Sequence, residues 1–172
     1  WFVTGGGSTS LYKANPSTGA VTTVTSSLGY GADGVAVEPD GSAAYVSCFN
    51  SHRVLKVTSG GTVTTLAGSG SAAHTDGTGT GASFYKPFGM LLGGGTLYLN
   101  ECGSATARAH TTGRIRSIVT ATGVTATIAT NLNSPDYIAM DNAGNFYTTS
   151  WNASCIQKIT GATTDYAVIA AI

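Results

Sequence analysis

Charged residues are scarce in this sequence. Only 9% of its 172 residues are Asp, Glu, Lys or Arg, and eight basic side chains balance eight acidic ones. Globular domains usually carry about 25% charged residues. A nucleic acid or an anionic membrane surface attracts an excess of Lys and Arg, so neither is expected as a partner. So little charge protects a cytosolic protein poorly against association, which favours a secreted protein at an extracellular or cell-surface location.

Long apolar runs are missing too. No stretch approaches the roughly 18 apolar residues of a membrane-spanning helix, so no membrane span is expected. Apolar residues nevertheless make up 42% of the chain and are spread evenly, which argues against disorder. Abundant Thr and Ser and 24 glycines favour strands and turns over helices. The composition therefore predicts a single all-β region over residues 1–172.

Four segments of the chain resemble one another. Each is anchored by an aromatic residue, at Phe2, Tyr45, Tyr98 and Tyr147, with spacings of 43, 53 and 49 residues. Each full segment contains four short stretches typical of strands, separated by Gly-rich turns. Four strands in a period of about 40–50 residues are typical of a β-propeller blade, whose sheet must stack on its neighbours to bury both faces. The predicted blades are approximately residues 1–27, 28–84, 85–133 and 134–172.

A Gly-rich run from residue 68 to residue 89 lies between two of these segments. A phosphate-binding loop would continue into Gly-Lys-Ser/Thr and a helix, whereas this run continues through Ser83-Phe84-Tyr85-Lys86-Pro87 into another strand. We therefore expect a structured connector from the outer strand of one blade to the inner strand of the next.

Several short motifs follow one another in a definite order. Residues 63–68 (VTTLAG), 76–79 (DGTG) and 82–84 (ASF) lie in and next to the Gly-rich run, and residues 53–57 (RVLKV) and 114–118 (RIRSI) begin later strands of their segments. In this order the motifs resemble the linker and the later strands of the NHL-repeat β-propeller family. The resemblance covers nearly the whole chain and implies a ring that commonly has six blades. About four blades are present, so we expect a partial propeller or a fragment of a larger protein. The start at Trp1, without an initiator Met, agrees with a processed or partial chain.

The chain departs from the family's pattern at two places. Tyr137 replaces the Gly of the inner strand, and Cys155 stands where the second and third segments have Arg53 and Arg114. The family includes binding scaffolds and a minority of enzymes, notably amidating lyases and lactonase-like relatives. The resemblance implies that such enzymes hold His, carboxylates and metals near the central channel.

The histidines do not fit that enzymatic pattern. His52, His74 and His110 all fall in expected loops at non-equivalent positions, so we expect solvated histidines. No metal site, no catalytic residue and no cofactor is predicted. The aspartates are expected in ordinary turns, and Glu101 has no carboxylate partner in the sequence for acid–base catalysis.

Three cysteines leave two interpretations open. Cys48 and Cys102 follow equivalent tyrosines by three and four residues, and Cys155 begins the third strand of the last blade. Blades that lie side by side allow a disulfide between Cys102 and Cys155 or between Cys48 and Cys102. Buried free thiols are the alternative.

Two surface features are candidates for contact with other molecules. Asn152 begins the tripeptide Asn-Ala-Ser, an acceptor sequence for N-glycosylation. An eight-residue insertion in the third segment lies near Arg108, His110 and Arg114, which we take as candidates for an interaction loop. A tolerated surface excursion explains the insertion equally well.

These observations favour a non-enzymatic extracellular module, a structural or interaction scaffold within a larger surface protein or assembly. Its expected partners are other protein chains or remaining blades of the same chain, and glycans. A propeller enzyme of the lyase or lactonase type, with metal-assisted chemistry in the central channel, is one alternative. A ligand-binding sensor domain is another.

Overall fold

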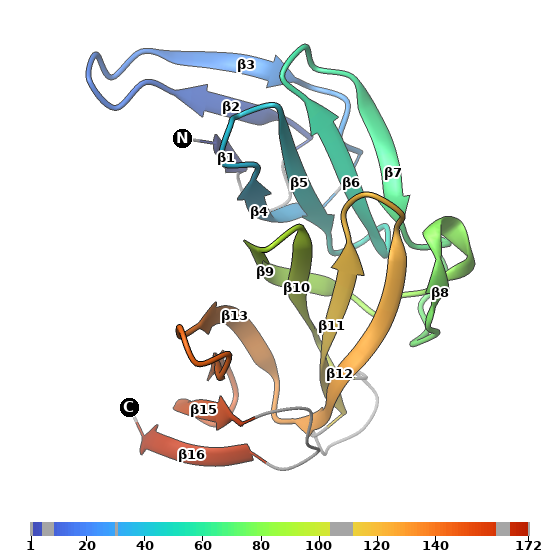
Figure 1. Ribbon diagram of the computed structural model, residues 1–172, viewed down its shortest axis with the longest axis vertical. Coiled ribbons are helices and arrows are strands. Elements are labelled where there is room, and N and C mark those ends of the chain that lie inside the picture. The colour runs from blue at the N-terminus through green and yellow to red at the C-terminus, as the bar shows by residue number, and fades with distance from the viewer. Residues whose placement is uncertain (1, 5–8, 30, 104–111, 161–165, 172) are drawn as a thin grey trace.

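The computed structural model describes residues 2–4, 9–29, 31–103, 112–160 and 166–171 (Figure 1). Regular structure in these residues is β-strand, apart from the short 3-10 helix η1 (Gly79–Gly81). None of these residues belongs to a helix that is long and apolar enough to cross a membrane.

The strands form four antiparallel sheets, and with the exception of β8 each strand pairs with its neighbour along the chain. The first sheet contains β1 (Phe2–Thr4), β2 (Leu11–Ala14) and β3 (Val21–Thr25). The second contains β4 (Ala32–Val37), β5 (Ala43–Cys48), β6 (Arg53–Thr58) and β7 (Val63–Ala67). The third contains β8 (Gly77–Thr78), β9 (Pro87–Gly93), β10 (Thr96–Glu101), β11 (Gly113–Val119) and β12 (Val124–Leu132). The fourth contains β13 (Pro135–Met140), β14 (Phe146–Ser150), β15 (Cys155–Ile159) and β16 (Tyr166–Ala171).

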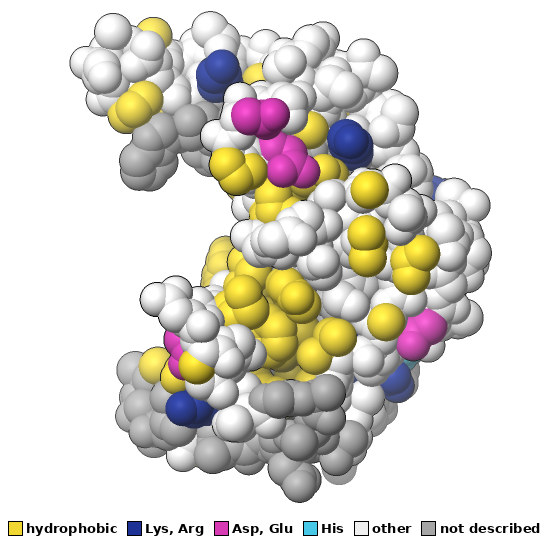
Figure 2. Space-filling view, in the orientation of Figure 1, with side chains coloured by type: hydrophobic (Ala, Val, Ile, Leu, Met, Phe, Trp, Pro, Cys, Tyr) yellow, Lys and Arg dark blue, Asp and Glu magenta, His cyan; other side chains and the backbone are white. Residues whose placement is uncertain are grey.

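The four sheets follow one another along an arc (Figure 1). The strands β4, β9 and β13 lie on its inner side, where β4 contacts β9 and β9 contacts β13. This is the arrangement of blades around the axis of a β-propeller, and it confirms the predicted fold class. On the face of the molecule drawn in Figure 2, charged side chains are sparse and hydrophobic side chains gather toward the inner side of the arc.

The repeat in the sequence is also a repeat in strand register. In every sheet the aromatic anchor of one strand faces the same position of the following strand. The pairs are Phe2 with Lys13, Tyr45 with Lys56, Tyr98 with Ser117, and Tyr147 with Lys158. Two of the lysines place their ammonium over the paired tyrosine ring, at 6.0 Å for Lys56 and 5.5 Å for Lys158. A cross-strand cation–π pair therefore recurs from one sheet to another.

The hydrophobic core consists of three clusters between successive sheets. Their members include Leu11, Val46 and Val57 in the first; Tyr45, Phe84 and Leu97 in the second; and Ile115, Leu132 and Phe146 in the third. Each middle sheet thus buries side chains on both of its faces, which is how stacked blades share one core.

Glycine allows the inner strands to approach closely. A Cβ added to Gly34 would lie 2.6 Å from the Phe88 carbonyl oxygen, and one added to Gly89 would lie 2.6 Å from the Asp136 carbonyl oxygen. Neither distance is tolerated by a real side chain. Tyr137 occupies the equivalent position on β13.

The connector between β7 and β9 is well structured, as the sequence predicts. Thr78 of β8 pairs with Val124, so β8 extends the edge of the third sheet. Phe84 is fully buried in the cluster between the second and third sheets. The connector therefore contacts both the second and the third sheet.

Candidate ligand-binding site

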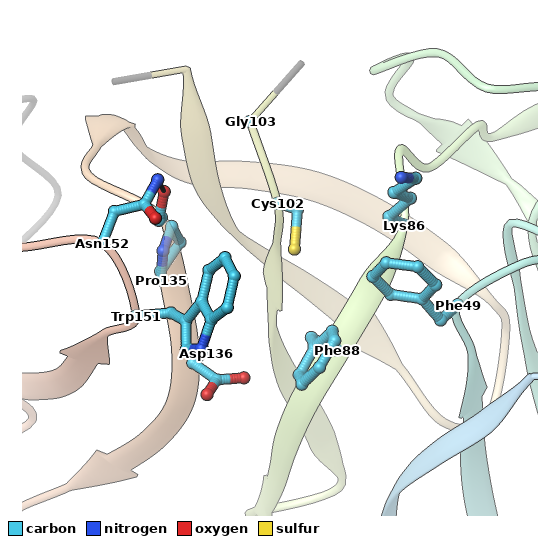
Figure 3. A pocket seen from close by; sticks show the side chains of 10 residues that line it. Phe49, Lys86, Phe88, Cys102, Gly103, Pro135, Asp136, Trp151 and Asn152 are labelled. Atoms are coloured by element: carbon cyan, nitrogen blue, oxygen red, sulfur yellow. Dashed lines mark hydrogen bonds between the residues drawn. The ribbon is translucent and has the colours of Figure 1, made fainter. Parts of the chain in front are cut away.

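A cavity of about 420 Å³ opens where three sheets meet at one end of their inner strands (Figure 3). Three of its lining residues directly follow a strand that carries an aromatic anchor: Phe49 after β5, Cys102 after β10 and Trp151 after β14. Phe88 and Asp136 line it from the first strands β9 and β13. The cavity is thus built from equivalent positions of neighbouring blades.

Strained backbone supports the cavity on two sides. Lys86 and Ser134 both line it and have positive φ angles, 52° and 40°. His52, with φ of 55°, accepts a hydrogen bond at its Nδ1 from the Lys86 backbone N–H at 3.1 Å. Residues other than Gly rarely adopt a backbone conformation with positive φ, and such strain concentrates at functional sites.

Aromatic side chains form opposite walls of the cavity. Phe49 and Phe88 meet edge to face with 5.3 Å between ring centres, and Phe88 meets Tyr137 in the same way at 6.3 Å. Figure 3 shows Trp151 on the other side, with the Cys102 thiol between the two walls. Trp151 is 80% exposed. A tryptophan this open to solvent beside other rings is typical of a binding surface.

Among the described residues that line the cavity, Lys86 supplies an ammonium and Asp136 a carboxylate. The Lys86 Nζ lies 4.9 Å from the centre of the Phe49 ring and 5.7 Å from that of Tyr85. Burial raises the pKa of the Asp136 carboxyl. Burial and the negative charge of Asp136 raise the pKa of Asp33 on β4, so the two carboxyl groups interact electrostatically.

The Cys102 thiol is a poor nucleophile. Burial, assisted by the negative charge of Asp136 and opposed by Lys86, raises its pKa to about 11. A thiol reacts as the thiolate, which is scarce so far below the pKa. Among the described residues, no three His, Cys, Asp or Glu side chains lie close enough together to hold a metal ion. The features present, apolar walls with a few polar groups, are those of a binding pocket.

The three cysteines are free thiols in this structure. Cys48 is buried among the core residues between the first two sheets, and its thiol donates to the Leu28 carbonyl at 3.7 Å. Cys102 faces the cavity, and Cys155 is buried on β15. Each thiol lies in different surroundings, and a disulfide between two of the three cysteines stays a prediction for thiol titration to test.

The other candidate residues are distributed over the chain. Asn152 is exposed at the rim of the cavity, and its amide donates to the Ser134 hydroxyl at 3.2 Å. Arg108 and His110 lie outside the described residues. Arg114 is the second residue of β11 rather than part of the preceding loop.

The sequence analysis did not anticipate a network of ionisable side chains around the buried pair Glu101 and Arg116. The expectation that His74 is solvated was wrong, because its Nδ1 is hydrogen-bonded to Glu101, whose side chain is 0% exposed. Arg116, also 0% exposed, donates to Glu101 and to Asp76 at 2.8 Å each. Asp76 further accepts from Thr127, so it is not the ordinary turn residue expected.

The turn interpretation of two other aspartates was right. Asp40 accepts a hydrogen bond from the Ser42 backbone N–H. Asp141 accepts from the backbone N–H groups of Ala143 and Asn145.

Comparisons with known proteins rest on structure alone, because no family model and no curated protein matches the sequence. An auxiliary nutrient binding protein from Bacteroides ovatus superposes with a TM-score of 0.68 at 19% identity, covering 92% of this chain and 44% of its own. Virginiamycin B lyase from Staphylococcus aureus superposes with a TM-score of 0.62 at 14% identity, covering 94% and 49%.

A chain of a nidogen–laminin complex superposes with a TM-score of 0.61 at 15% identity, covering 91% of this chain and 70% of its own. The present chain spans less than half the length of the nutrient binding protein and of the lyase. At such identities the likeness concerns the fold. These neighbours are an enzyme, a binding protein and a member of a protein complex, and what they share with this chain is the β-propeller fold.

Proposed function

We propose that this chain is part of an extracellular, NHL-like propeller that acts by binding rather than by catalysis. The observation that carries the proposal is the cavity with Trp151 on one wall and Phe49 and Phe88 on the other. Its volume of about 420 Å³ lies within the range of small-molecule sites, about 300–1,000 Å³. The proposal makes the chain an interaction module whose ligand enters at the ends of the inner strands.

Other observations support parts of this proposal. The low charge of the chain favours a location outside the cell. The same fold occurs in a nutrient binding protein and in a chain of a nidogen–laminin complex. The lyase has this fold as well, so the proposal needs a test that separates binding from turnover.

Thermal unfolding in the presence of compound families tests the binding role. Sugars, amino acids, organic amines, nucleotides and short peptides are added singly to the protein. A ligand at 100 times its Kd stabilises the folded state by about 2.7 kcal/mol, which raises the Tm of a chain this size by roughly 5–10 °C. We expect at least one family to raise the Tm of the wild type and to lose that effect in Trp151→Ala.

Tyr12→Ala is the matched control, because Tyr12 is 37% exposed on β2 and does not line the cavity. It should keep the wild-type response. Shifts that persist in Trp151→Ala, or the absence of any shift, would contradict a binding role for this cavity. Mass analysis of each active compound after incubation separates the two functions: an unchanged compound supports binding, and a cleaved one supports the lyase-like alternative.

The extracellular part of the proposal includes a glycan at Asn152. Expressed through a eukaryotic secretory pathway, the protein should lose mass on enzymatic deglycosylation. Asn152→Gln and Ser154→Ala should abolish that loss, and Asn50→Gln, outside an acceptor tripeptide, should not. A wild-type mass that deglycosylation leaves unchanged would speak against glycosylation.

A further inference from the structure

The inner wall near the cavity carries two carboxylates at equivalent positions. Asp33 precedes Gly34 on β4, and Asp136 precedes Tyr137 on β13. Phe88 holds the same position on β9, which lies between them. The charge of Asp136 acts on Asp33, so the carboxylates are within electrostatic reach across Phe88.

Asp136 is the carboxylate that the cavity exposes to a ligand. Burial accounts for its raised pKa, and no hydrogen bond from the described residues offsets that effect. Its ionised form therefore lies in partly desolvated surroundings, and its negative charge also acts on Asp33. A cation placed beside it would relieve both.

The aromatic walls add to this preference. Ring faces carry partial negative charge and attract cations. Phe88 and Trp151 line the same cavity as Asp136, and in Figure 3 the Asp136 carboxylate lies below the Trp151 ring and to the left of Phe88. Lys86, the cation among the described lining residues, lies on the opposite wall with its ammonium near the rings of Phe49 and Tyr85.

We propose that the cavity binds an organic ammonium ion joined to a flat apolar ring, with the ring between Trp151 and the Phe49–Phe88 pair and the ammonium beside Asp136. This deepens the proposed function and rests on it. An anionic ligand would meet the charges of Asp136 and Asp33. A neutral sugar would not offset the charge of the partly buried Asp136 carboxylate, so charge complementarity favours the cation.

Three small probes separate the contributions of charge and ring. Isothermal titration calorimetry at pH 7.5 compares 2-phenylethylamine, its neutral analogue 2-phenylethanol, and butylamine, which lacks the ring. Both amines are protonated at this pH, as Lys is. We expect 2-phenylethylamine to bind at least about tenfold more tightly than the alcohol, the factor for a hydrogen bond to a charged group, and also more tightly than butylamine.

Variants assign each contribution to a side chain. Asp136→Asn should reduce the binding of 2-phenylethylamine to that of the alcohol and leave the alcohol unchanged. Lys86→Met removes the opposing charge and should increase the preference for the amine. Trp151→Ala should weaken both ring probes and leave butylamine unchanged. Asp40→Asn, a turn residue outside the cavity, is the matched control and should change nothing.

Two outcomes would overturn the inference and leave the binding function standing: equal binding of the amine and the alcohol, or an amine preference that survives Asp136→Asn. In either case another compound family would still raise the Tm of the wild type but not of Trp151→Ala. If Asp136→Asn fails to fold, Asp33→Asn serves instead, with a smaller expected loss of amine preference. An unchanged preference in that variant would then refute the role of the paired carboxylates.

Discussion

Arg116 is the buried charge on which the stability of the third sheet should depend most. Its side chain and that of Glu101 are both 0% exposed and are joined by a hydrogen bond of 2.8 Å. The guanidinium also donates to two backbone carbonyls of the connector and to the Asp76 carboxylate. Arg116→Met removes all four contacts and leaves the Glu101 carboxylate buried with His74 as its remaining partner.

The size of the effect follows from the loss of one partner of a buried ion pair. That loss costs about 3–5 kcal/mol, out of a total stability of about 5–15 kcal/mol. In a chain of this length 1 kcal/mol shifts the Tm by roughly 2–4 °C, so Arg116→Met should lower it by about 10 °C. Arg53→Met is the matched control. Arg53 is partly exposed and donates to the Ser69 carbonyl at 3.2 Å, a contact worth about 1 kcal/mol.

Urea unfolding of the single and double variants decides the question. In Arg116→Met/Glu101→Leu no lone charge stays buried, so the double variant should regain much of the stability that Arg116→Met loses. Equal unfolding midpoints for Arg116→Met and Arg53→Met would refute the argument. So would a double variant whose loss equals the sum of the two single losses.

Three further predictions concern other parts of the chain. Gly89→Ala places a Cβ 2.6 Å from a carbonyl oxygen and should lower the free energy of unfolding by about 1–3 kcal/mol, whereas Gly81→Ala, with open space around it, should not; equal urea midpoints would contradict this. Hydrogen bonds, first from the Asn145 side chain, lower the pKa of Asp141 to about 2. Because folding lowers this pKa, the stabilisation is present above about pH 4 and is lost as the pH falls through about 2. The urea midpoint of the wild type should therefore exceed that of Asp141→Asn at pH 5 and equal it near pH 2. A difference between the two midpoints that does not change with pH would refute this prediction. Burial raises the pKa of the Cys48 and Cys102 thiols to about 11, so a disulfide reagent at pH 8 should react slowly with the folded protein and detect three thiols after unfolding; fewer than three would demonstrate a bridge.

The propeller was predictable because its repeat is carried by local chemistry. The aromatic anchors and the Gly-rich turns each specify a short strand or its end, and the registers follow from them. Tyr45 and Tyr147 each face a lysine eleven positions later, as the sequence spacing requires. Stacking then follows, because one sheet cannot bury both faces alone.

The buried charges were not predictable by the same reasoning. Glu101 and His74 are 27 residues apart, and only the path of the connector brings them together. Ile115 and Arg116 are adjacent on β11, yet both are buried, because neighbouring structure covers both faces of this sheet. Alternation of polar and apolar residues therefore gives no sign of a buried arginine in a stacked blade.

Part of the cavity lining could have been predicted from the repeat in the sequence. The residues four positions after three of the aromatic anchors are Phe49, Cys102 and Trp151. Equivalent positions of neighbouring blades lie at the same end of their sheets, so these side chains were bound to gather. The volume of the cavity between these side chains, and the presence of Asp136 in its lining, depend on how the sheets pack, which the spacing of residues in the sequence does not reveal.

Tyr137 breaks the rotational symmetry that Gly34 and Gly89 maintain. Each of those glycines lets the next inner strand stand so close that a Cβ would meet its carbonyl oxygen at 2.6 Å. Tyr137 has that Cβ, and contacts shorter than about 3.0 Å are essentially never made by such atoms. Any strand that packs beside β13 in the same direction around the axis must therefore stand farther away than β9 stands from β4. A further blade at that side would therefore meet the inner strand of the last sheet at a larger angular step than the one between β4 and β9.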